Sequence, residues 1–64
     1  MIFLNGEERD EAGSNLDDLL LKEGYDKVRI AVGLNGQAVS KENYSDIILK
    51  DNDVVEVFHF MGGG

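Results

Sequence analysis

Hydrophobic and polar positions along the chain alternate in short segments that predict a small set of strands and one helix. An apolar run at residues 1–4 is followed by Asn5-Gly6 and then by a polar stretch from Glu7 to Glu11. Both residues of an Asn-Gly pair accept the positive φ that a tight type I′ turn requires. The chain is therefore expected to begin with a β-hairpin.

One helix of two to three turns is predicted before Gly24, which supplies a left-handed stop. Ser14 or Asn15 can cap its first turn, where two aspartates face the positive end of the helix dipole. Apolar residues recur at the 3.6-residue spacing of a helix. The face predicted to point inward consists of Leu16, Leu19, Leu20 and, at its end, Glu23.

A strand is predicted from Val28 to Leu34, where large apolar residues alternate with small or charged ones. Asn35-Gly36 then predicts a second hairpin turn, which leads into a short strand, Gln37-Ala38-Val39. The residues of the longer strand expected to point inward are Val28, Ile30, Val32 and Leu34, and those expected to point outward are Arg29, Ala31 and Gly33.

The last strand is predicted from Val54 to Phe60, after one helical turn within Ser40–Asp46, a short apolar run at 47–49 and a turn at 51–53. Glu56 is not expected in a small dry core, so its side chain should point to the face of the sheet that the helix leaves uncovered, the open face. Because side chains alternate along a strand, this fixes the face of every other residue in it. The side chains expected toward the helix are Val55, Val57 and His59, and those expected on the open face are Val54, Glu56, Phe58 and Phe60.

This order of elements predicts an α+β domain, a mixed sheet with one helix packed on one of its faces. The domain is expected to occupy residues 1–60, and residues 61–64 are expected to form a flexible tail. The predicted core contains Leu16, Leu19, Leu20, Ile30, Val32, Val55 and Val57.

Composition argues against an enzyme. Hydrophobic residues make up 42% of 64 residues, which suffices for one small core but not for a core and a deep substrate cavity. His59 is the only histidine and there is no cysteine, so we predict no catalytic site, no metal site and no bound cofactor.

The charge excludes several kinds of partner. Thirteen acidic residues against six scattered basic ones give a net charge of −7, which disfavours nucleic acid and anionic membrane surfaces. The apolar run at the start is too short for a signal peptide or a membrane span. We therefore expect a cytoplasmic protein that is a monomer when free.

Exposed aromatic side chains on the open face predict a surface for docking another protein. Two phenylalanines of the last strand would project there beside the outward residues of the neighbouring strand. The residues predicted to bind a partner are Phe58, Phe60, Met61, Arg29 and Ala31.

The three final glycines are the most informative motif. They can be a remnant of cloning or a frayed end, but glycine also lets a backbone pass through a slot too narrow for other residues. Four residues beyond Phe60 reach about 13–14 Å. Such an arm can deliver a terminal carboxylate to another protein's active site, where it must first be activated, most simply as an acyl-adenylate.

The segment from Asp51 to Gly64, DNDVVEVFHFMGGG, together with the compact length and the order of elements, resembles the ubiquitin-like β-grasp sulfur carriers of thiamin (thiazole) biosynthesis. The resemblance covers essentially the whole chain and is most specific in the tail. It implies a β-grasp fold and a sulfur carrier that is not itself a catalyst.

The resemblance also implies the partners and the roles of the tail. A ubiquitin-activating-type adenylyltransferase would use ATP to adenylate Gly64, and sulfur derived from cysteine would convert it to a thiocarboxylate for thiazole synthase. Gly63 would complete the diglycine, and Gly62 would extend the arm in place of the small non-glycine residue of some relatives. Two alternatives stay open: a carrier like the small subunit of molybdopterin synthase, and a non-conjugating ubiquitin-like binding module.

Overall fold

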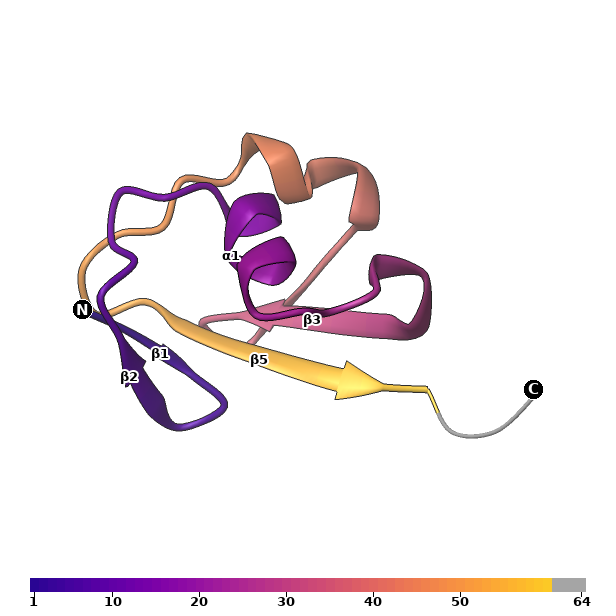
Figure 1. Cartoon of the computed structure of the whole chain (residues 1–64), viewed down its shortest axis with the longest axis horizontal. Coiled ribbons are helices and arrows are strands. Elements are labelled where there is room, and N and C mark those ends of the chain that lie inside the picture. Colours follow the sequence, from indigo (N-terminus) through magenta and orange to yellow (C-terminus); the bar gives the residue numbers. More distant parts are fainter. Residues whose placement is uncertain (61–64) are drawn as a thin grey trace.

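The computed structural model describes residues 1–60; the predicted tail, with Met61, Gly62, Gly63 and Gly64, lies outside the described residues. Within residues 1–60, five strands form one sheet. Helix α1 (Leu16–Lys22) and the 3₁₀ helix η2 (Lys41–Asp46) lie on the same side of it (Figure 1). The predicted α+β class, with one α-helix on one face of a mixed sheet, is confirmed.

The order of strands across the sheet is β2-β1-β5-β3-β4, so the last strand lies at the centre. Strands β1 and β5 pair in parallel, and the other neighbours pair antiparallel. The strands are β1 (Ile2–Leu4), β2 (Glu7–Arg9), β3 (Ile30–Leu34), β4 (Gln37–Val39) and β5 (Val54–His59).

Both predicted hairpin turns are present. Asn5 and Gly6 have φ of 50° and 84°, and Asn35 and Gly36 have φ of 52° and 85°. These are the left-handed values that a type I′ turn needs, and asparagine and glycine adopt them at the lowest cost. The first turn joins β1 to β2 and the second joins β3 to β4.

Helix α1 begins and ends where its capping residues predict. Of the two candidate caps, Asn15 is the one used: its side-chain oxygen accepts hydrogen bonds from the Asp17 and Asp18 amides. Gly24 follows the last turn with φ of 82°, and its amide donates to the Leu21 carbonyl. The Tyr25 amide donates to the Leu20 carbonyl, which completes a Schellman motif.

The predicted strand from Val28 begins two residues too early. The Asp26 side chain accepts a hydrogen bond from the Val28 amide and starts the 3₁₀ helix η1 (Lys27–Arg29). Strand β3 therefore starts at Ile30, and the Val28 side chain is 75% exposed instead of pointing inward. An aspartate that caps a turn competes with an extended backbone, and this local interaction prevails over the alternating pattern.

The predicted helical turn after β4 is η2, and it contributes a core residue that the polar pattern concealed. Tyr44 is buried and packs in the hydrophobic cluster, where desolvation raises the pKa of its hydroxyl. In the apolar run that follows, Leu49 is buried but Ile48 is exposed. One buried residue per turn is too little periodicity for sequence patterns to detect.

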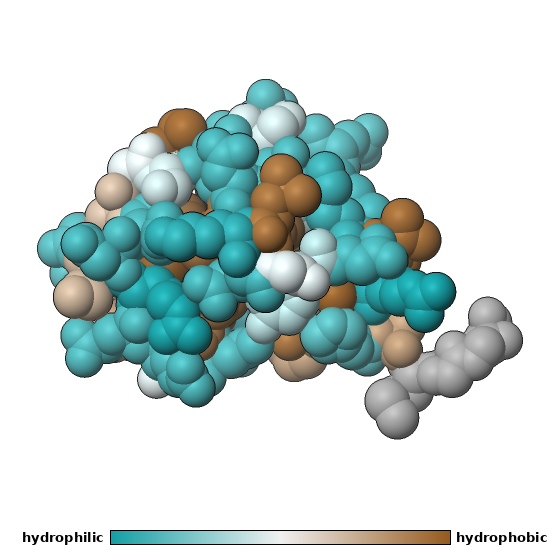
Figure 2. All heavy atoms as spheres, in the orientation of Figure 1, coloured by the Kyte–Doolittle hydropathy of each residue, from teal (hydrophilic) through white to brown (hydrophobic). Residues whose placement is uncertain are grey.

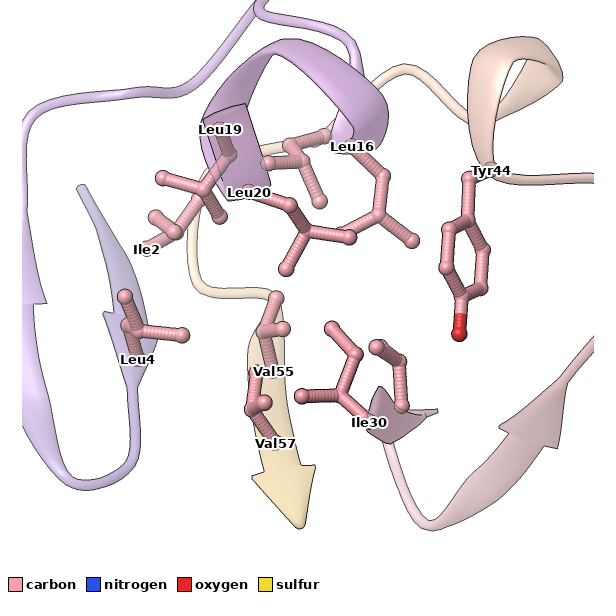
Figure 3. Packing of buried hydrophobic residues seen from close by; sticks show 11 residues of the cluster. Ile2, Leu4, Leu16, Leu19, Leu20, Ile30, Tyr44, Val55 and Val57 are labelled. Atoms are coloured by element: carbon pink, nitrogen blue, oxygen red, sulfur yellow. The ribbon is translucent and has the colours of Figure 1, made fainter. Parts of the chain in front are cut away.

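The core lies between α1, η2 and the sheet (Figure 3). All seven residues predicted for it are buried, including Leu19 at 0% exposure. Among the helices of residues 1–60, none has the length and apolar character needed to cross a bilayer. The core residues that the sequence analysis did not predict are Ile2, Leu4, Tyr44 and Leu49.

Candidate functional site

The candidate site is the point where the central strand leads into the C-terminal segment. Strand β5 pairs with β1 on one side and with β3 on the other. The register with β3 continues one residue past the strand, because the Phe60 amide donates to the Arg29 carbonyl at 3.0 Å. The chain is therefore held to the sheet up to Phe60, the last described residue.

Two asparagine side chains hold this strand in place. The Asn5 side-chain oxygen accepts from the Val57 amide at 2.8 Å, and the Asn35 side-chain oxygen accepts from the Val54 amide at 2.8 Å. The Asn5 side-chain amide also reaches the Tyr25 hydroxyl, at 3.3 Å. Both hairpin turns thus contact β5, a role that sequence reasoning missed because it treated each Asn-Gly pair only as a local turn.

Replacing Asn5 with glycine should separate the two roles of this residue. Glycine keeps the positive φ of 50° at little cost, but it removes both side-chain hydrogen bonds and leaves the part-buried Val57 amide without its acceptor. An unsatisfied buried donor costs about 1–3 kcal/mol, so the free energy of unfolding in urea should fall by that amount.

Asn52→Gly is the matched control for this measurement. Asn52 also has a positive φ, of 74°, but it is exposed and its side chain makes no hydrogen bond within residues 1–60. Its replacement should leave the free energy of unfolding nearly unchanged. Equal losses in the Asn5 and Asn52 variants would contradict a specific role for the Asn5 side chain.

Asp53 fixes the start of the same strand. Its carboxylate accepts from the Asn35 side-chain amide at 3.0 Å and from the Lys50 main-chain amide at 2.8 Å. These two hydrogen bonds hold the pKa of the Asp53 carboxyl below its ordinary value of 3.8, and the bond from Asn35 has the larger effect. The folded protein therefore favours the ionised carboxylate.

The sign of this pKa shift predicts a pH dependence. Because the folded pKa of Asp53 is lowered, its stabilising contribution is complete above the unfolded pKa, near 3.8, and is lost as the pH falls through the folded value. The difference in free energy of unfolding between wild type and Asp53→Asn should be constant above about pH 5 and shrink below about pH 4. A difference that does not change down to pH 2 would contradict this linkage.

The open face of the sheet carries the predicted docking residues Phe58 and Ala31. These two residues are direct partners in the β3–β5 register, and the Phe58 side chain is 57% exposed. A shallow hollow of about 240 Å³ lies beside them and is also lined by Gly33, Ala38 and Glu56. We call these five residues, Ala31, Gly33, Ala38, Glu56 and Phe58, the open-face surface.

The structure brings Arg29 and Phe60 together at the end of the β3–β5 pairing, where the Phe60 amide bonds the Arg29 carbonyl. Arg29 lies in η1, so it is not an outward residue of the strand, and its exposed side chain pairs with Asp26 at 3.4 Å. Phe60 is 61% exposed, and the Lys41 ammonium lies 6.0 Å from the centre of its ring. This distance is at the outer limit of a cation–π contact. Sequence reasoning missed Lys41, which η2 brings to the end of the last strand.

His59 lies on the predicted face of the last strand. It pairs in register with the buried Ile30, and its ring centre lies 5.5 Å from that of Tyr25, on the helix side. The His59 side chain is nonetheless exposed. A single exposed imidazole against a tyrosine ring provides no catalytic arrangement.

Residues 1–60 contain no group of three His, Asp or Glu side chains that could hold a metal ion. A larger hollow of about 400 Å³ lies between β4 and η2, and among the described residues that line it Asp46 is the one charged residue. Because the Asp46 carboxylate repels the phosphates of a nucleotide, this hollow is unsuited to binding one.

On the side of the molecule shown in Figure 2, hydrophilic residues predominate and hydrophobic ones form small separate areas.

Comparison with known proteins shows the family. The model of the ThiS family matches residues 2–64. The sulfur carrier protein ThiS of Thermus thermophilus is 41% identical over 64 residues, and that of Bacillus subtilis is 34% identical over 67 residues; each match covers 100% of both chains. A thiazole synthase of Magnetococcus marinus is 42% identical over 64 residues.

The match to thiazole synthases covers nearly all of this chain but only a small part of those proteins. It covers 98% of this chain but 20% of the Magnetococcus protein, so the chain spans about one fifth of that relative's length. A crystal structure of the thiamine biosynthesis protein (ThiS) from Geobacter metallireducens superposes with a TM-score of 0.78 at 33% identity, covering 98% of this chain and 97% of that one. The fold and the family expected from the sequence are thereby confirmed, and the chain belongs to the ThiS family.

Proposed function

We propose that this chain carries sulfur for thiamin biosynthesis as a thiocarboxylate on Gly64. A ubiquitin-activating-type adenylyltransferase activates the carboxylate with ATP, a cysteine-derived donor supplies the sulfur, and thiazole synthase accepts it. The chain contributes a docking surface and an arm, and its partners contribute the catalysis. ATP is a substrate of the activating enzyme and is not bound by the chain alone.

The observation that carries this proposal is the way β5 ends. The strand lies at the centre of the sheet, two asparagine side chains fix its backbone, and pairing with Arg29 extends to Phe60. A strand held in this way gives the four residues that follow a defined starting point. The family match continues through those residues to Gly64.

The proposed chemistry proceeds in three displacements. A carboxylate oxygen of Gly64 attacks the α-phosphorus of ATP, pyrophosphate leaves, and an acyl-adenylate remains. The terminal sulfur of the donor, a persulfide made from cysteine sulfur, then bonds to the carbonyl carbon while the bond from that carbon to the AMP oxygen breaks, which gives an acyl disulfide. A thiol finally attacks the donor's own sulfur, the S–S bond breaks with its electron pair on the acyl sulfur, and the thiocarboxylate is released while the thiol and the donor are joined as a disulfide.

Intact-mass spectrometry tests the proposal directly. The purified chain is incubated with the adenylyltransferase of the same organism, ATP and a cysteine-derived sulfur source. We expect a gain of about 16 Da, the mass difference between sulfur and oxygen, that depends on ATP. The unreacted mass must also show Gly64 as the last residue, because only a free carboxylate can be adenylated. An unchanged mass in the complete reaction would refute the carrier mechanism and favour an inert ubiquitin-like module.

The open-face surface is proposed to dock the partners, and Phe58→Ala tests it. Truncating an aromatic residue at the centre of an interface typically costs 2 kcal/mol or more, which is about thirtyfold in affinity. We expect this loss in the Kd for the adenylyltransferase or thiazole synthase, with little change in stability because the ring is largely exposed. Ile48→Ala removes a similarly exposed apolar side chain, 55% exposed, away from this surface and should bind normally. Normal binding by the Phe58 variant would contradict the docking role.

The partial match to thiazole synthases favours the thiazole role over the molybdopterin alternative. In the Magnetococcus and Paramagnetospirillum proteins named thiazole synthase, 20% of the length aligns with nearly all of this chain. Joining a carrier to its sulfur acceptor in one polypeptide raises their effective concentration. The cytoplasmic location and the monomeric state of the free chain stay predictions.

A further inference from the structure

Strand β5 extends beyond its neighbour β1. The parallel pairing ends at Leu4 and Val55, where the chain of β1 turns away at Asn5. The pairing with β3 continues on the other side to Ile30 and His59. In Figure 1 the β1–β2 hairpin accordingly ends before β5 does, and the second half of β5 has no strand on that side.

The hydrogen-bond pattern shows which main-chain groups face this gap. The Asn35 amide bonds the Val54 carbonyl and the Phe60 amide bonds the Arg29 carbonyl, so the even-numbered residues of β5 face β3. The odd-numbered residues face the β1 side. The Val55 carbonyl there accepts from the Asn5 amide, and the Val57 amide uses the Asn5 side chain.

Three main-chain groups remain on that side without a partner within residues 1–60. They are the Val57 carbonyl and both the amide and the carbonyl of His59. A strand with unpaired groups in register is a template for an added strand. This template lies one residue before Phe60, where the described chain ends.

The other free edges are less suitable. On β2 the Glu8 carbonyl accepts from the Arg9 guanidinium at 3.0 Å, and the two glutamates of this strand, Glu7 and Glu8, add negative charge. On β4, which has three residues, only Ala38 directs its main-chain groups outward, because Val39 and Gln37 face β3 in the hairpin register. The gap beside β5 is the free edge that continues directly toward the proposed reactive end.

We propose that the enzyme that adenylates Gly64 adds an extended segment of its own backbone to the free edge of β5 at Val57–His59. The segment takes the place that β1 leaves, so that carrier and enzyme share one sheet up to the start of the tail. This inference rests on the proposed function, because it names how the tail's partner holds the chain. The inference requires that this enzyme present an exposed extended segment whose N–H and C=O groups are free to pair.

Two measurements with the adenylyltransferase test the shared sheet. In the wild-type chain the His59 amide should exchange with solvent freely and become protected in the complex, whereas the outward-facing Glu8 amide should not change. The second measurement compares Kd values of His59→Pro and His59→Ala. Proline removes the amide donor, which is tolerated where the N–H is unpaired, and alanine removes only the side chain.

We expect His59→Pro to weaken binding about tenfold, the effect of losing one hydrogen bond of average strength, and His59→Ala to bind like wild type. Glu8→Pro, which removes an outward N–H on β2, should also bind like wild type. Equal Kd values for the two His59 variants, or an unprotected His59 amide in the complex, would overturn the inference.

Sulfur loading distinguishes this inference from the proposed function. If the wild-type chain gains about 16 Da while its His59 amide stays exchangeable in the complex, the carrier mechanism holds and the shared sheet is wrong. If the wild-type chain neither binds the enzyme nor gains mass, both are wrong. The exchange measurement uses the wild-type chain, so it decides the question even if His59→Pro does not fold.

Discussion

Deleting Gly64 is expected to abolish sulfur loading without changing the fold. The deletion moves the reacting carbonyl back by one residue, about 3.3–3.6 Å, while the core stays intact. A misplacement of 1 Å can already cost about a hundredfold in rate. The mass gain of about 16 Da should therefore disappear, and the unfolding transition should keep its midpoint.

Adding one residue beyond Gly64 is the complementary variant. It keeps every residue of the chain but moves the free carboxylate past the position that the enzyme's active site accepts. Loading should again be lost while docking is retained, because the open-face surface is unchanged. Normal sulfur incorporation in either variant would refute transfer through the Gly64 carboxylate.

Leu19→Ala is expected to lower the free energy of unfolding by about 2–5 kcal/mol, the range for truncating a buried leucine. Leu19 is 0% exposed and packs with Leu16, Leu20 and Ile2 in the core cluster (Figure 3). A small domain has a total stability of only about 5–15 kcal/mol, so a large part of it should be lost. Urea unfolding followed by far-UV circular dichroism measures the difference.

Leu21→Ala provides the matched control on the same helix. Leu21 lies two residues away, is 62% exposed and undergoes the same chemical change. Since alanine is the better helix former, this variant should be within about 0.5 kcal/mol of wild type. Similar losses in the two variants would contradict burial of the Leu19 side chain as the cause of the effect.

The sequence alone determined the parts of this protein that depend on local interactions. Asn5-Gly6 and Asn35-Gly36 predicted both hairpins because positive φ is a property of those residues themselves. The spacing of leucines predicted α1 and its buried face. The alternation in β5 predicted that Phe58 would be exposed and Val57 buried, since neighbouring side chains of a strand point to opposite faces.

The family was also accessible from sequence, because the glycine tail and the order of elements are linear features. The comparisons confirmed it over residues 2–64. The roles assigned to Gly62, Gly63, Gly64 and Met61 stay predictions, since these residues lie outside the described structure. The docking roles of Phe58, Phe60, Arg29 and Ala31 likewise await the binding measurements.

Only the tertiary structure decided which distant groups meet. Capping by Asp26 starts a 3₁₀ helix that leaves Val28 exposed, although the alternating pattern predicted it to point inward. Tyr44 is buried because η2 packs against the sheet at this position. The Asn5 side chain reaches Val57 across 52 positions of sequence, and the same turn ends β1 early enough to leave the edge of β5 free at His59. No local pattern encodes these contacts, because hydrogen bonds and burial between remote segments follow from how the whole sheet pairs and packs.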